Sequence, residues 1–514
     1  MDSAVVDLWN TDRVLALSSW HDDWRGMRAA VLGLGVTGFS VADTLAELGA
    51  QVRVIYRGGD TDRERLLEVI GAEWAGLDDD AQQLAALEAF APDLVIVSPG
   101  YRPDHPLTEW AIAQGIVVWG DIELAWRLRD KTTRIADWIC VTGTNGKTTT
   151  TQLTAHMLHA GGLRVAPVGN IGTPVLDALR DPQGYDVLVV ELSSYQLHRL
   201  GEISPFSSAC LNLAEDHLDW HGSMEAYTRA KAHIFDGVQI ACVYNRADTA
   251  TERMVEDADV VEGARAISFG LDSPPPSGFG MVDGILVDRG FHDERRNEAY
   301  ELVTLDELRE TGLASPHLVE NVLAAAALAR SRGVTPEQIA MAVLSFKLDA
   351  HRVQHLGSTS AAPGVAWVDD SKATNAHAAD AALRAYERVV WLVGGQLKGV
   401  DIAALVAKHA PRLRGAVVLG ADRAEVLAAL AQHAPGVPVL EAASVDTDEV
   451  MTEAVAAAAS LASAGDTVLL SPAAASLDQF TDYTDRGRRF QAAVRALTGG
   501  DAGDDHAPTG AQLD

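Results

Sequence analysis

The sequence predicts an α/β protein built from three domains. A chain of 514 residues is several times the length of a typical domain of about 150 residues, which favours two to four separate cores. Short apolar strands alternate with helical stretches in three successive series, and the first two series each contain a glycine-rich turn between a strand and a helix. Apolar residues make up 47% of the chain, a globular composition that excludes disorder of the whole chain.

The first series begins with the segment 27–56, MRAAVLGLGVTGFSVADTLAELGAQVRVIY. It reads as a strand, a glycine turn, a helix and a second strand, which is the start of a parallel βαβ unit. Gly33, Gly35 and Gly38 form the pattern G-x-G-x-x-G at the end of the first strand, where a dinucleotide-binding fold holds pyrophosphate. The pattern alone is weak evidence, but it points to a diphosphate ligand.

The end of the second strand bears on which diphosphate binds. A protein that binds NAD carries an acidic residue there for the ribose, whereas this strand ends in Tyr56 and Arg57. A nicotinamide cofactor is therefore disfavoured, and another diphosphate such as a nucleotide sugar still suits the loop.

The second series opens with VTGTNGKTTTTQLT, residues 141–154, directly after an apolar strand. Gly143 and Gly146 flank Thr144 and Asn145, so successive backbone N–H groups can form an anion-binding nest ahead of a helix N-terminus. The stretch therefore predicts a phosphate-binding loop.

The residues after this loop fit a nucleotide. Lys147 would reach the β- and γ-phosphates, and Thr148 would offer its hydroxyl to Mg²⁺. A strict P-loop carries glycine where this chain has Val141. The alternative is a glycine turn with a solvated lysine, which the coincidence of strand, Gly-Lys-Thr and helix makes the weaker interpretation.

The rest of the central domain contains further strands and closes with helices. We expect strands at VAPVGN, YDVLVVEL, SACLNLA and IACVYN, and a helix in HLVENVLAAAALARSRG. A last helix is expected at Thr335–Phe346, where TPEQ offers an N-cap threonine, a proline at the first helical position and a capping-box glutamine. We expect the segment Asp272–Arg296 to be a structureless surface insertion.

An acidic and histidine-bearing group lies within the central series: Glu191, His217 and Lys231. Glu191 ends a strand, on the side where open α/β sheets bind ligands. It could hold Mg²⁺ with the help of His217, or it could be a solvated or capping glutamate, and the spacing leaves both readings open.

A third α/β series follows His351, with strands expected near GVAWVDD, RVVWLVGG, GAVVLG and DTVLLSP. The final residues, GGDAGDDHAPTGAQLD, read as a solvated acidic tail.

Charge and cysteine usage restrict the class of partner. The chain has 41 Lys and Arg against 72 Asp and Glu, a formal net charge of −31, which repels nucleic acid and anionic lipid. Cys140, Cys210 and Cys242 lie in strand-like runs with no CxxC pair, as in the core of a reduced cytoplasmic protein. A signal peptide and an apolar run of about 18 residues are both missing, so we expect neither secretion nor a membrane span.

Seven motifs, in order, resemble those of the ATP-dependent Mur ligases. They are TGTNGKTT, GNIG, ELSSYQL, NLAEDHLDWHG, AHR, DDSKATN and SPAAASLDQF. The resemblance implies a Rossmann-like N-terminal domain at 1–127 that binds a UDP substrate and a central P-loop ATPase domain at 128–348. It also implies a Rossmann-like C-terminal domain at 349–498 that binds the incoming amino acid, with a disordered acidic tail at 499–514.

The resemblance also implies a reaction. ATP would phosphorylate the carboxylate of UDP-N-acetylmuramoyl-L-alanine in the presence of Mg²⁺, and the amine of D-glutamate would displace phosphate from the acyl phosphate. The handedness of the amino acid is implied by the family alone. No nucleic acid or membrane partner is expected, and the protein is expected to be a cytoplasmic monomer.

Site residues carry over from the family position by position. The catalytic residues implied are Lys147, His217 and Lys231. The residues implied as Mg²⁺ ligands are Thr148, Glu191, His217 and Lys231, the last as a carbamate, which two clustered metals would favour. The ATP contacts implied are Gly143, Thr144, Asn145, Gly146, Lys147, Thr148, Thr149, Asn321, Arg352 and Asp370. The UDP-substrate contacts implied are Gly35, Val36, Thr37, Gly100 and Asn170, and the amino-acid contacts are Lys372, Thr374, Lys398, Ser476 and Tyr483.

Three alternatives remain. Folylpolyglutamate synthase also joins glutamate to a carboxylate, but it should lack an N-terminal nucleotide-sugar domain. A diaminopimelate-adding Mur ligase should carry an Asn-Pro-Arg segment, which this sequence does not contain. A nucleotide-binding regulator without catalysis is disfavoured by the intact Lys147, Glu191, His217, Lys231 and Arg352.

Overall fold

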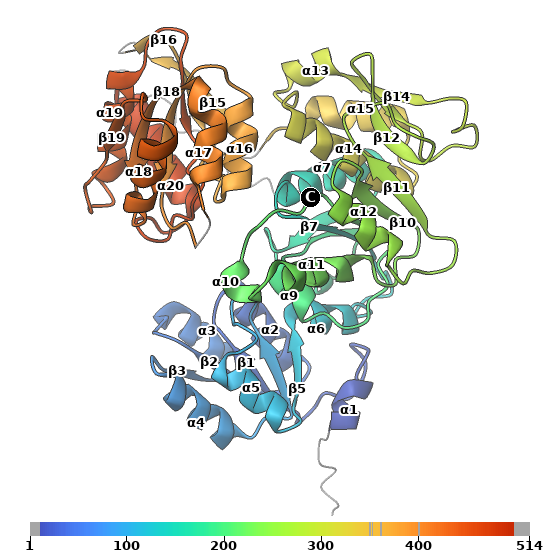
Figure 1. Ribbon diagram of the computed structural model, residues 1–514. Coiled ribbons are helices and arrows are strands. Elements are labelled where there is room, and N and C mark those ends of the chain that lie inside the picture. Colours follow the sequence, from blue (N-terminus) through green and yellow to red (C-terminus); the bar gives the residue numbers. More distant parts are fainter. Residues whose placement is uncertain (1–10, 349–350, 352, 360–361, 399–400, 498–514) are drawn as a thin grey trace, which may run out of the picture. The chain divides into compact units, whose positions relative to one another are not determined.

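The computed structural model describes residues 11–348, 351, 353–359, 362–398 and 401–497 (Figure 1). The chain divides into two compact units. One comprises the residues up to Leu213 together with Trp220–Phe346, and the other comprises Ala214–Asp219 together with the residues from Lys347 onward. Two α/β sheets lie in the first unit and a third lies in the second, which confirms the predicted fold class. The predicted tail at 499–514 and Arg352 lie outside the described residues.

The first sheet is wholly parallel, with strand order β3-β2-β1-β4-β5. Its elements are β1 (Arg28–Leu32), α2 (Val36–Glu47), β2 (Gln51–Tyr56), α3 (Thr61–Ile70), β3 (Glu73–Gly76), α4 (Asp80–Phe90), β4 (Leu94–Val97), α5 (Pro106–Ala113) and β5 (Val117–Gly120), with α1 (Thr11–Ala16) before them and α6 (Asp121–Arg127) after them. Alternate residues of one strand enter different cores: Ala29 and Val31 pack in one cluster, Ala30 and Leu32 in another. Both faces of the sheet are therefore buried, as helices on two sides require.

The three glycines of the first loop have separate structural roles. Gly33 has a φ of 103°, a conformation that glycine adopts readily. A Cβ on Gly38 would lie 2.0 Å from the carbonyl oxygen of Gly33, so only glycine lets α2 start this close to β1. Gly35 is the N-cap of α2 and has no atom within 4 Å of a built Cβ, which leaves its backbone open to a ligand.

The second sheet has strand order β14-β13-β12-β11-β10-β9-β6-β8-β7. Its strands are β6 (Asp137–Thr142), β7 (Val165–Gly169), β8 (Val187–Glu191), β9 (Ser207–Cys210), β10 (Ala241–Asn245), β11 (Arg265–Phe269), β12 (Gly278–Val282), β13 (Ile285–Asp288) and β14 (Tyr300–Thr304). The helices of this part are α7 (Lys147–Ala160), α8 (Val175–Leu179), α9 (Ser194–His198), α10 (Leu218–His221), α11 (Met224–Ala232), α12 (Thr249–Glu256), α13 (Leu305–Glu310), α14 (Pro316–Ser331) and α15 (Pro336–Ser345). All of the strands expected here are present. The N-cap of α15 is Thr335, with the predicted capping box to Gln338.

The prediction that Asp272–Arg296 is a structureless insertion is wrong. The strands β12 and β13 within it pair in antiparallel fashion, and β12 also pairs in parallel with β11, so the segment extends the sheet. Asp283 and Gly284 join the two strands with φ values of 49° and 80°. Positive φ at both turn residues is the geometry that an Asp-Gly hairpin favours. The Asp-Gly dipeptide therefore indicated the hairpin in the sequence, but the proline-rich stretch before it suggested a loop.

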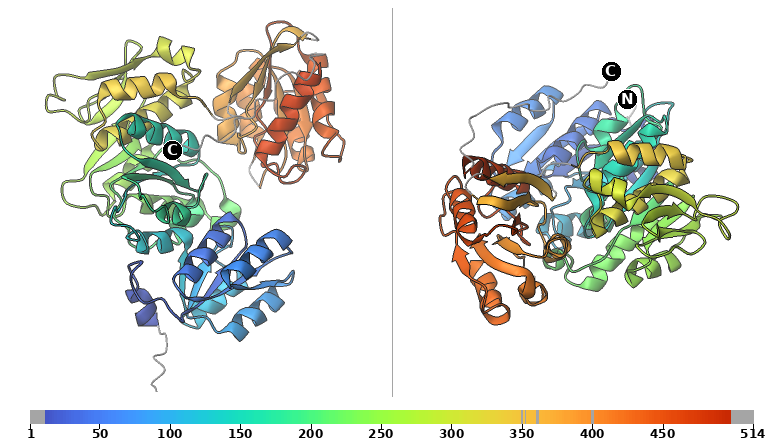
Figure 2. Two further views of the ribbon diagram at one scale, coloured as in Figure 1. Left: turned by 180° about the vertical axis from the view of Figure 1, so that it is seen from behind. Right: turned by 90° about the horizontal axis from the view of Figure 1, so that it is seen from above.

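The sheet of the second unit has strand order β15-β16-β20-β17-β18-β19, parallel except for β15. Its elements are β15 (Gln354–Thr359), β16 (Ala362–Asp369), α16 (Ala376–Arg384), β17 (Val389–Gly394), α17 (Ala403–His409), β18 (Leu413–Leu419), α18 (Arg423–His433), β19 (Val439–Glu441), α19 (Val450–Leu461), β20 (Thr467–Leu470) and α20 (Tyr483–Leu497). The four expected strands are present. Sequence patterns missed β15 and β19 because one is largely polar and the other has three residues. Figure 2 shows helices along both sides of this sheet.

Two further expectations concern the chemistry of the core and the membrane. The three cysteines are buried and free, and burial raises the pKa of each thiol to about 12. Searched over its described ranges, the chain has no helix of the length and apolarity that a membrane span requires.

Candidate nucleotide and ligation site

The predicted phosphate loop joins β6 to α7. Gly143 has a φ of 152° and Gly146 a φ of 83°, so both glycines stand where an L side chain would be strained. A Cβ on Gly146 would lie 2.4 Å from the side-chain oxygen of Asn321. Asn321 belongs to α14 and is buried, so packing places this predicted ATP contact directly over the loop.

Lys147 begins α7 and folds back over the loop. Its Nζ atom donates to the carbonyl oxygens of Gly143, at 3.0 Å, and Thr144, at 2.9 Å. Thr148 and Thr149 follow in the first helical turn and are buried. N–H groups at a helix start and an ammonium group held beside them together suit the binding of phosphate.

Asn212 clamps this loop, and the sequence analysis did not identify it. Its side-chain oxygen accepts from the N–H of Asn145 at 2.9 Å, and its Nδ2 donates to the Asn145 carbonyl at 3.1 Å. Its own carbonyl accepts from the N–H of Thr144 at 3.0 Å. Asn212 lies two residues after β9, which pairs with β6. Its place in the NLAEDH motif, next to the neighbour of the loop strand, was the available signal.

Helix α11 holds the loop from the other side. Tyr227 and Lys231 are four residues apart, hence on one face of the helix, and each is 1% exposed. The Tyr227 hydroxyl lies 3.0 Å from the hydroxyl of Thr144. Lys231 donates through Nζ to the Gly143 carbonyl at 2.9 Å and to the Thr142 hydroxyl at 3.3 Å. Lys231 is 88 residues from Gly143 in the sequence, yet its side chain lies against the loop.

Glu191 lies at the end of β8, in register with Val141 of β6, and is 2% exposed. Its Oε1 atom accepts from the side-chain amide of Asn170 at 2.9 Å. Its Oε2 atom is buried and has no hydrogen-bond partner among the described residues. A buried carboxylate oxygen without a partner is costly unless a ligand satisfies it, and carboxylate oxygen is a preferred ligand of Mg²⁺. Glu191 therefore fits the predicted metal site.

His217 belongs to the segment Ala214–Asp219, which groups with the second unit. It has a φ of 54°, and its Nε2 atom is 3.5 Å from Oδ2 of Asp216. The same Asp216 oxygen accepts from Asn375 at 3.2 Å. The grouping of His217 with Glu191 and Lys231 stays a prediction. In the described ranges no three or more His, Cys, Asp or Glu side chains are arranged as a metal centre; the predicted ligand set depends in addition on a threonine and a modified lysine.

The predicted UDP-substrate contacts fall on two sheets. Gly35, Val36 and Thr37 form the start of α2 after β1, and Gly100 follows β4, the neighbour of β1. These loops share one edge of the first sheet. Asn170, in contrast, follows β7 of the second sheet and contacts Glu191.

A carboxylate of α3 lies against the end of β2. The Tyr56 hydroxyl hydrogen-bonds to Glu64 of α3, and burial together with this contact raises the pKa of Tyr56 to about 12. Arg57 pairs with Asp80 at 2.5 Å. Glu64 therefore brings a carboxylate next to the last residue of β2, where the strand itself has none.

In the second unit, Lys372 and Tyr483 are in contact. The Lys372 ammonium group donates to the Tyr483 hydroxyl at 2.7 Å and lies 3.9 Å from the ring centroid. Thr374 donates its N–H to the Lys372 carbonyl at 2.8 Å. Arg486 is fully buried and ties the same region together, because it donates to Ser371 and to the carbonyl of Ala474. Burial lowers the pKa of Arg486 to about 10.

The loops after β17 and β20 are also joined. Gln396 and Ala475 form a two-residue antiparallel bridge, with both N–H to carbonyl distances at 2.9 Å. Lys398, exposed and with a φ of 54°, follows one side of this bridge, and buried Ser476 follows the other. The strands β16, β20 and β17 are adjacent, so the predicted amino-acid contacts gather at the carboxyl edge of one sheet.

The predicted ATP contacts of the second unit are described in part. Asp370 follows β16, is buried, and accepts from the Ser471 hydroxyl at 2.9 Å. Arg352 lies outside the described residues. Its neighbour His351 is buried and contacts Asp369 through Nδ1 at 2.6 Å.

Three family descriptions match this chain. Residues 27–120 match the Mur ligase MurD-like N-terminal domain, residues 141–329 the Mur ligase middle domain, and residues 351–474 the Mur ligase glutamate ligase domain.

Curated relatives are similar over almost the whole chain. The UDP-N-acetylmuramoylalanine–D-glutamate ligase of Leifsonia xyli subsp. xyli is 62% identical over 504 residues, covering 96% of this chain and 97% of the relative. The enzyme of the same name from Streptomyces avermitilis is 50% identical over 479 residues, covering 92% and 99%.

Solved structures show the same fold at low identity. The UDP-N-acetylmuramate-alanine ligase of Thermotoga maritima is 19% identical with a TM-score of 0.54, covering 91% of this chain and 99% of its own. A murein peptide ligase from Psychrobacter arcticus is 18% identical with a TM-score of 0.51, with the same coverage.

Proposed function

Because this chain belongs to the Mur ligase family, we propose that it joins D-glutamate to UDP-N-acetylmuramoyl-L-alanine with hydrolysis of ATP, a step of peptidoglycan precursor synthesis. The near full-length similarity to ligases of that name carries the proposal. The phosphate loop and the cationic loops of the third sheet support it. The domain limits at residues 127/128 and 348/349 belong to the same proposal.

The phosphate loop is suited to transfer of the γ-phosphoryl group. The substrate carboxylate attacks the γ-phosphorus, the bond to the bridging oxygen breaks, and ADP leaves with an acyl phosphate formed. Such transfer depends mainly on positioning and on neutralising charge on the phosphoryl oxygens. Lys147 and the N–H groups at the start of α7 supply that charge, and Asn212 and Tyr227 hold the loop that carries them.

Mg²⁺ would be held by Glu191 and Thr148, with Lys231 as a carbamate and His217 at a second ion. When bound, the ions would neutralise charge on the phosphates. Glu191 is oriented by Asn170 and keeps its second oxygen for a ligand. Lys231 as an ammonium group could not ligate a cation, so this role requires the modification.

The second chemical step is attack of an amine on the acyl phosphate, which releases inorganic phosphate and forms the amide bond. We assign the amino acid to the carboxyl edge of the third sheet, where Lys372 and Lys398 supply positive charge and Tyr483 and Ser476 supply hydroxyls. Two cations suit an amino acid with a second carboxylate. A side chain without that carboxylate would leave a desolvated cation unpaired, at a cost of roughly 2 kcal/mol.

A cytoplasmic monomer is part of the proposal. The three buried free thiols suit a reducing compartment.

Phosphate release, measured with one component omitted or exchanged at a time, tests this function. With ATP, Mg²⁺ and UDP-N-acetylmuramoyl-L-alanine present, release should require D-glutamate and be poor with D-glutamine, diaminopimelate or L-lysine. Lys147→Ala serves as the inactive control, with a fall of about 10²-fold or more expected from loss of a positioned cation.

Either of two results would replace the proposal. If L-glutamate on a folate acceptor supported release and the muramoyl substrate did not, the chain would be a folylpolyglutamate synthase. If ATP were bound but no acceptor supported release, a non-catalytic regulator would be the correct reading.

A further inference from the structure

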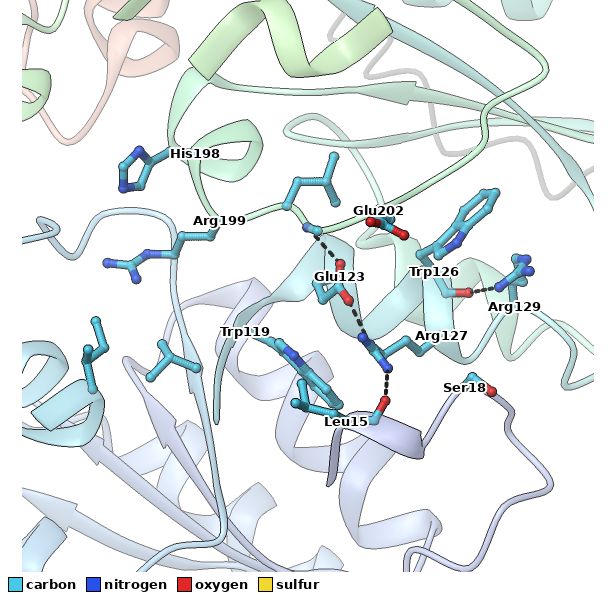
Figure 3. Close-up of a pocket in the computed structure, with 14 residues that line it drawn as sticks. Leu15, Ser18, Trp119, Glu123, Trp126, Arg127, Arg129, His198, Arg199 and Glu202 are labelled. Carbon is cyan, nitrogen blue, oxygen red and sulfur yellow. Dashed lines mark hydrogen bonds and ion pairs between the residues drawn. The ribbon is translucent and has the colours of Figure 1, made fainter. Parts of the chain in front are cut away.

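A cavity of about 780 Å³ lies in the first unit among residues given no role above. Its lining comes from four places in the chain (Figure 3). Leu15 and Ser18 come from α1 and the residues after it, and Ile112 and Val118 from α5 and β5. The rest come from the end of β5, from α6 and the residues just after it, and from residues 198–202 at the end of α9 and beyond. Its volume is typical of a pocket for a small organic molecule.

One side of the cavity is preformed by Glu123, which is 4% exposed. Its Oε1 accepts from Arg127 Nε at 2.7 Å, and its Oε2 accepts from the N–H of Gly201 at 2.9 Å (Figure 3). Arg127 also donates to the carbonyls of Leu15, at 3.0 Å, and Leu17, at 2.6 Å. The Glu123–Arg127 ion pair thus links three segments of the chain, and the net charge of this wall is close to zero.

Two arginine–indole pairs add flat surfaces. The guanidinium carbon of Arg127 is 4.3 Å from the ring centroid of Trp119, and that of Arg129 is 4.2 Å from the ring of Trp126. A guanidinium group above an indole ring adds a polarisable surface against which a further flat ring can pack. Leu15 and Ile112 add apolar surface at the rim, where they are 48% and 61% exposed.

Among the described residues, Arg129 and Arg199 line this cavity without an ion pair, and Arg199 in addition has a buried donor that is not satisfied. Its Nε is buried without a hydrogen-bond partner among the described residues, and no ion pair to it occurs in that part of the chain. Its terminal nitrogen makes only long contacts, at 3.3 and 3.4 Å, to the carbonyls of Tyr101 and Arg102. Burial lowers the pKa of Arg199. A buried N–H group of a cation that is left unpaired costs free energy which an anionic ligand would recover.

The charge balance favours an anion here. Three arginines line the cavity against two glutamates, Glu123 and Glu202, in a chain whose net charge is −31. One unsatisfied guanidinium matches a singly charged carboxylate better than a phosphate, which needs several donors.

We propose that this cavity binds a small aromatic carboxylic acid, with its ring against the two arginine–indole pairs and its carboxylate at Arg199. This site is separate from the residues assigned to ATP, the UDP substrate and the amino acid, and it does not depend on the proposed function. Arg199 follows Glu191 by eight residues and contacts the carbonyl next to Gly100, so a ligand here would touch segments that lead to both substrate loops.

Calorimetric titration of the full chain with 1-naphthoate tests the site, with saturating ADP and UDP present to occupy the nucleotide sites. Neutral 1-naphthamide is the comparison ligand. We expect 1-naphthoate to bind about tenfold more tightly than 1-naphthamide, the factor that corresponds to one hydrogen bond to a charged group. Arg199→Gln should abolish this difference, and Arg253→Gln, on the exposed surface of α12, should retain it.

A second variant keeps the proposal testable if Arg199→Gln does not fold. Leu15→Glu adds an acid at the exposed rim and should weaken 1-naphthoate binding severalfold without changing thermal unfolding. Leu66→Glu is its matched control, because Leu66 is also 48% exposed but lies on α3. The proposal is overturned if 1-naphthoate does not bind at millimolar concentration, if 1-naphthamide binds as tightly, or if neither Arg199→Gln nor Leu15→Glu changes the affinity.

Discussion

The side-chain amide of Asn170 donates to Oε1 of Glu191 at 2.9 Å, and the Asn170 N–H donates to the Glu191 carbonyl at the same distance. A residue predicted to contact the UDP substrate therefore orients a residue predicted to bind Mg²⁺. The two proposed sites are joined by one hydrogen-bonded pair.

Asn170→Ala should lower kcat/KM about 10- to 100-fold, because a hydrogen bond to a charged group contributes about 1.5–3 kcal/mol. The Mg²⁺ concentration for half-maximal rate should rise as well, since Glu191 loses the donor that fixes its orientation. Phosphate release against Mg²⁺ concentration measures both. Asn297→Ala, at an exposed position, is the control. An unchanged Mg²⁺ dependence in Asn170→Ala would show that Asn170 does not orient Glu191 for the metal.

Asn212→Ala should raise the KM for ATP about tenfold. The substitution removes both side-chain hydrogen bonds to Asn145, so the phosphate loop must be ordered when ATP binds. The KM for the UDP substrate should stay within about twofold, because no contact to the first sheet is lost. Equal changes in both KM values would indicate a general loss of structure instead of a loop clamp.

Lys231→Ala should be inactive and should regain part of its activity with a small carboxylate such as formate. In the structure the lysine is an amine that donates to Gly143, so two roles compete: donor to the loop or, after carbamylation, an anion that holds Mg²⁺. Formate can replace only the anion. Rescue by ethylammonium in place of formate, or full activity without rescue, would show that the carbamate is not required.

Tyr483→Phe should raise the KM for D-glutamate about three- to tenfold at nearly constant kcat. The substitution removes the hydroxyl that accepts from Lys372 at 2.7 Å and so frees a cation of the proposed amino-acid site; a net hydrogen bond is worth about 1 kcal/mol. Steady-state kinetics with varied D-glutamate measures the effect. Tyr386→Phe, in the same unit, should leave this KM unchanged, and a similar rise there would argue against a specific role.

Asp121→Asn should stabilise the protein at pH 8. Asp121 is buried, accepts from Gln196 at 3.0 Å through Oδ2, and has a second oxygen without a hydrogen-bond partner in the described ranges. Burial raises the pKa of Asp121 to about 6. The folded state therefore binds more protons than the unfolded state between about pH 4 and 6, so this carboxyl lowers stability as pH rises through that window.

The penalty is complete above the folded pKa of about 6 and amounts to about 3 kcal/mol at most. Thermal unfolding should thus show a higher midpoint for Asp121→Asn than for the unsubstituted chain at pH 8, and a smaller difference at pH 5.5. A variant that is less stable at pH 8 would show that the ionised carboxylate is favourable in the fold.

Short sequence patterns were enough to predict the local features of this protein. The strand, glycine turn and helix at 28–47, the loop from Gly143 to Lys147 and the capping box at Thr335 each depend on residues close together in the chain. Backbone sterics and capping act over that range, so short patterns carry the information. The Asp-Gly turn of the β12–β13 hairpin was equally local, and the error there was one of interpretation.

Contacts between residues far apart in the chain depend on how the strands and helices pack. The pairing of β6 with β8 and β9 brings Glu191 and Asn212 to the phosphate loop from 44 and 65 residues after Lys147. Packing of α11 brings Tyr227 and Lys231 to the same loop, and the edge strand β15 is held mainly by its pairing with β16. The physical reason is that strand order and helix packing minimise the exposed apolar area of the whole domain. That area depends on residues from the entire domain, so a short stretch of sequence cannot predict it.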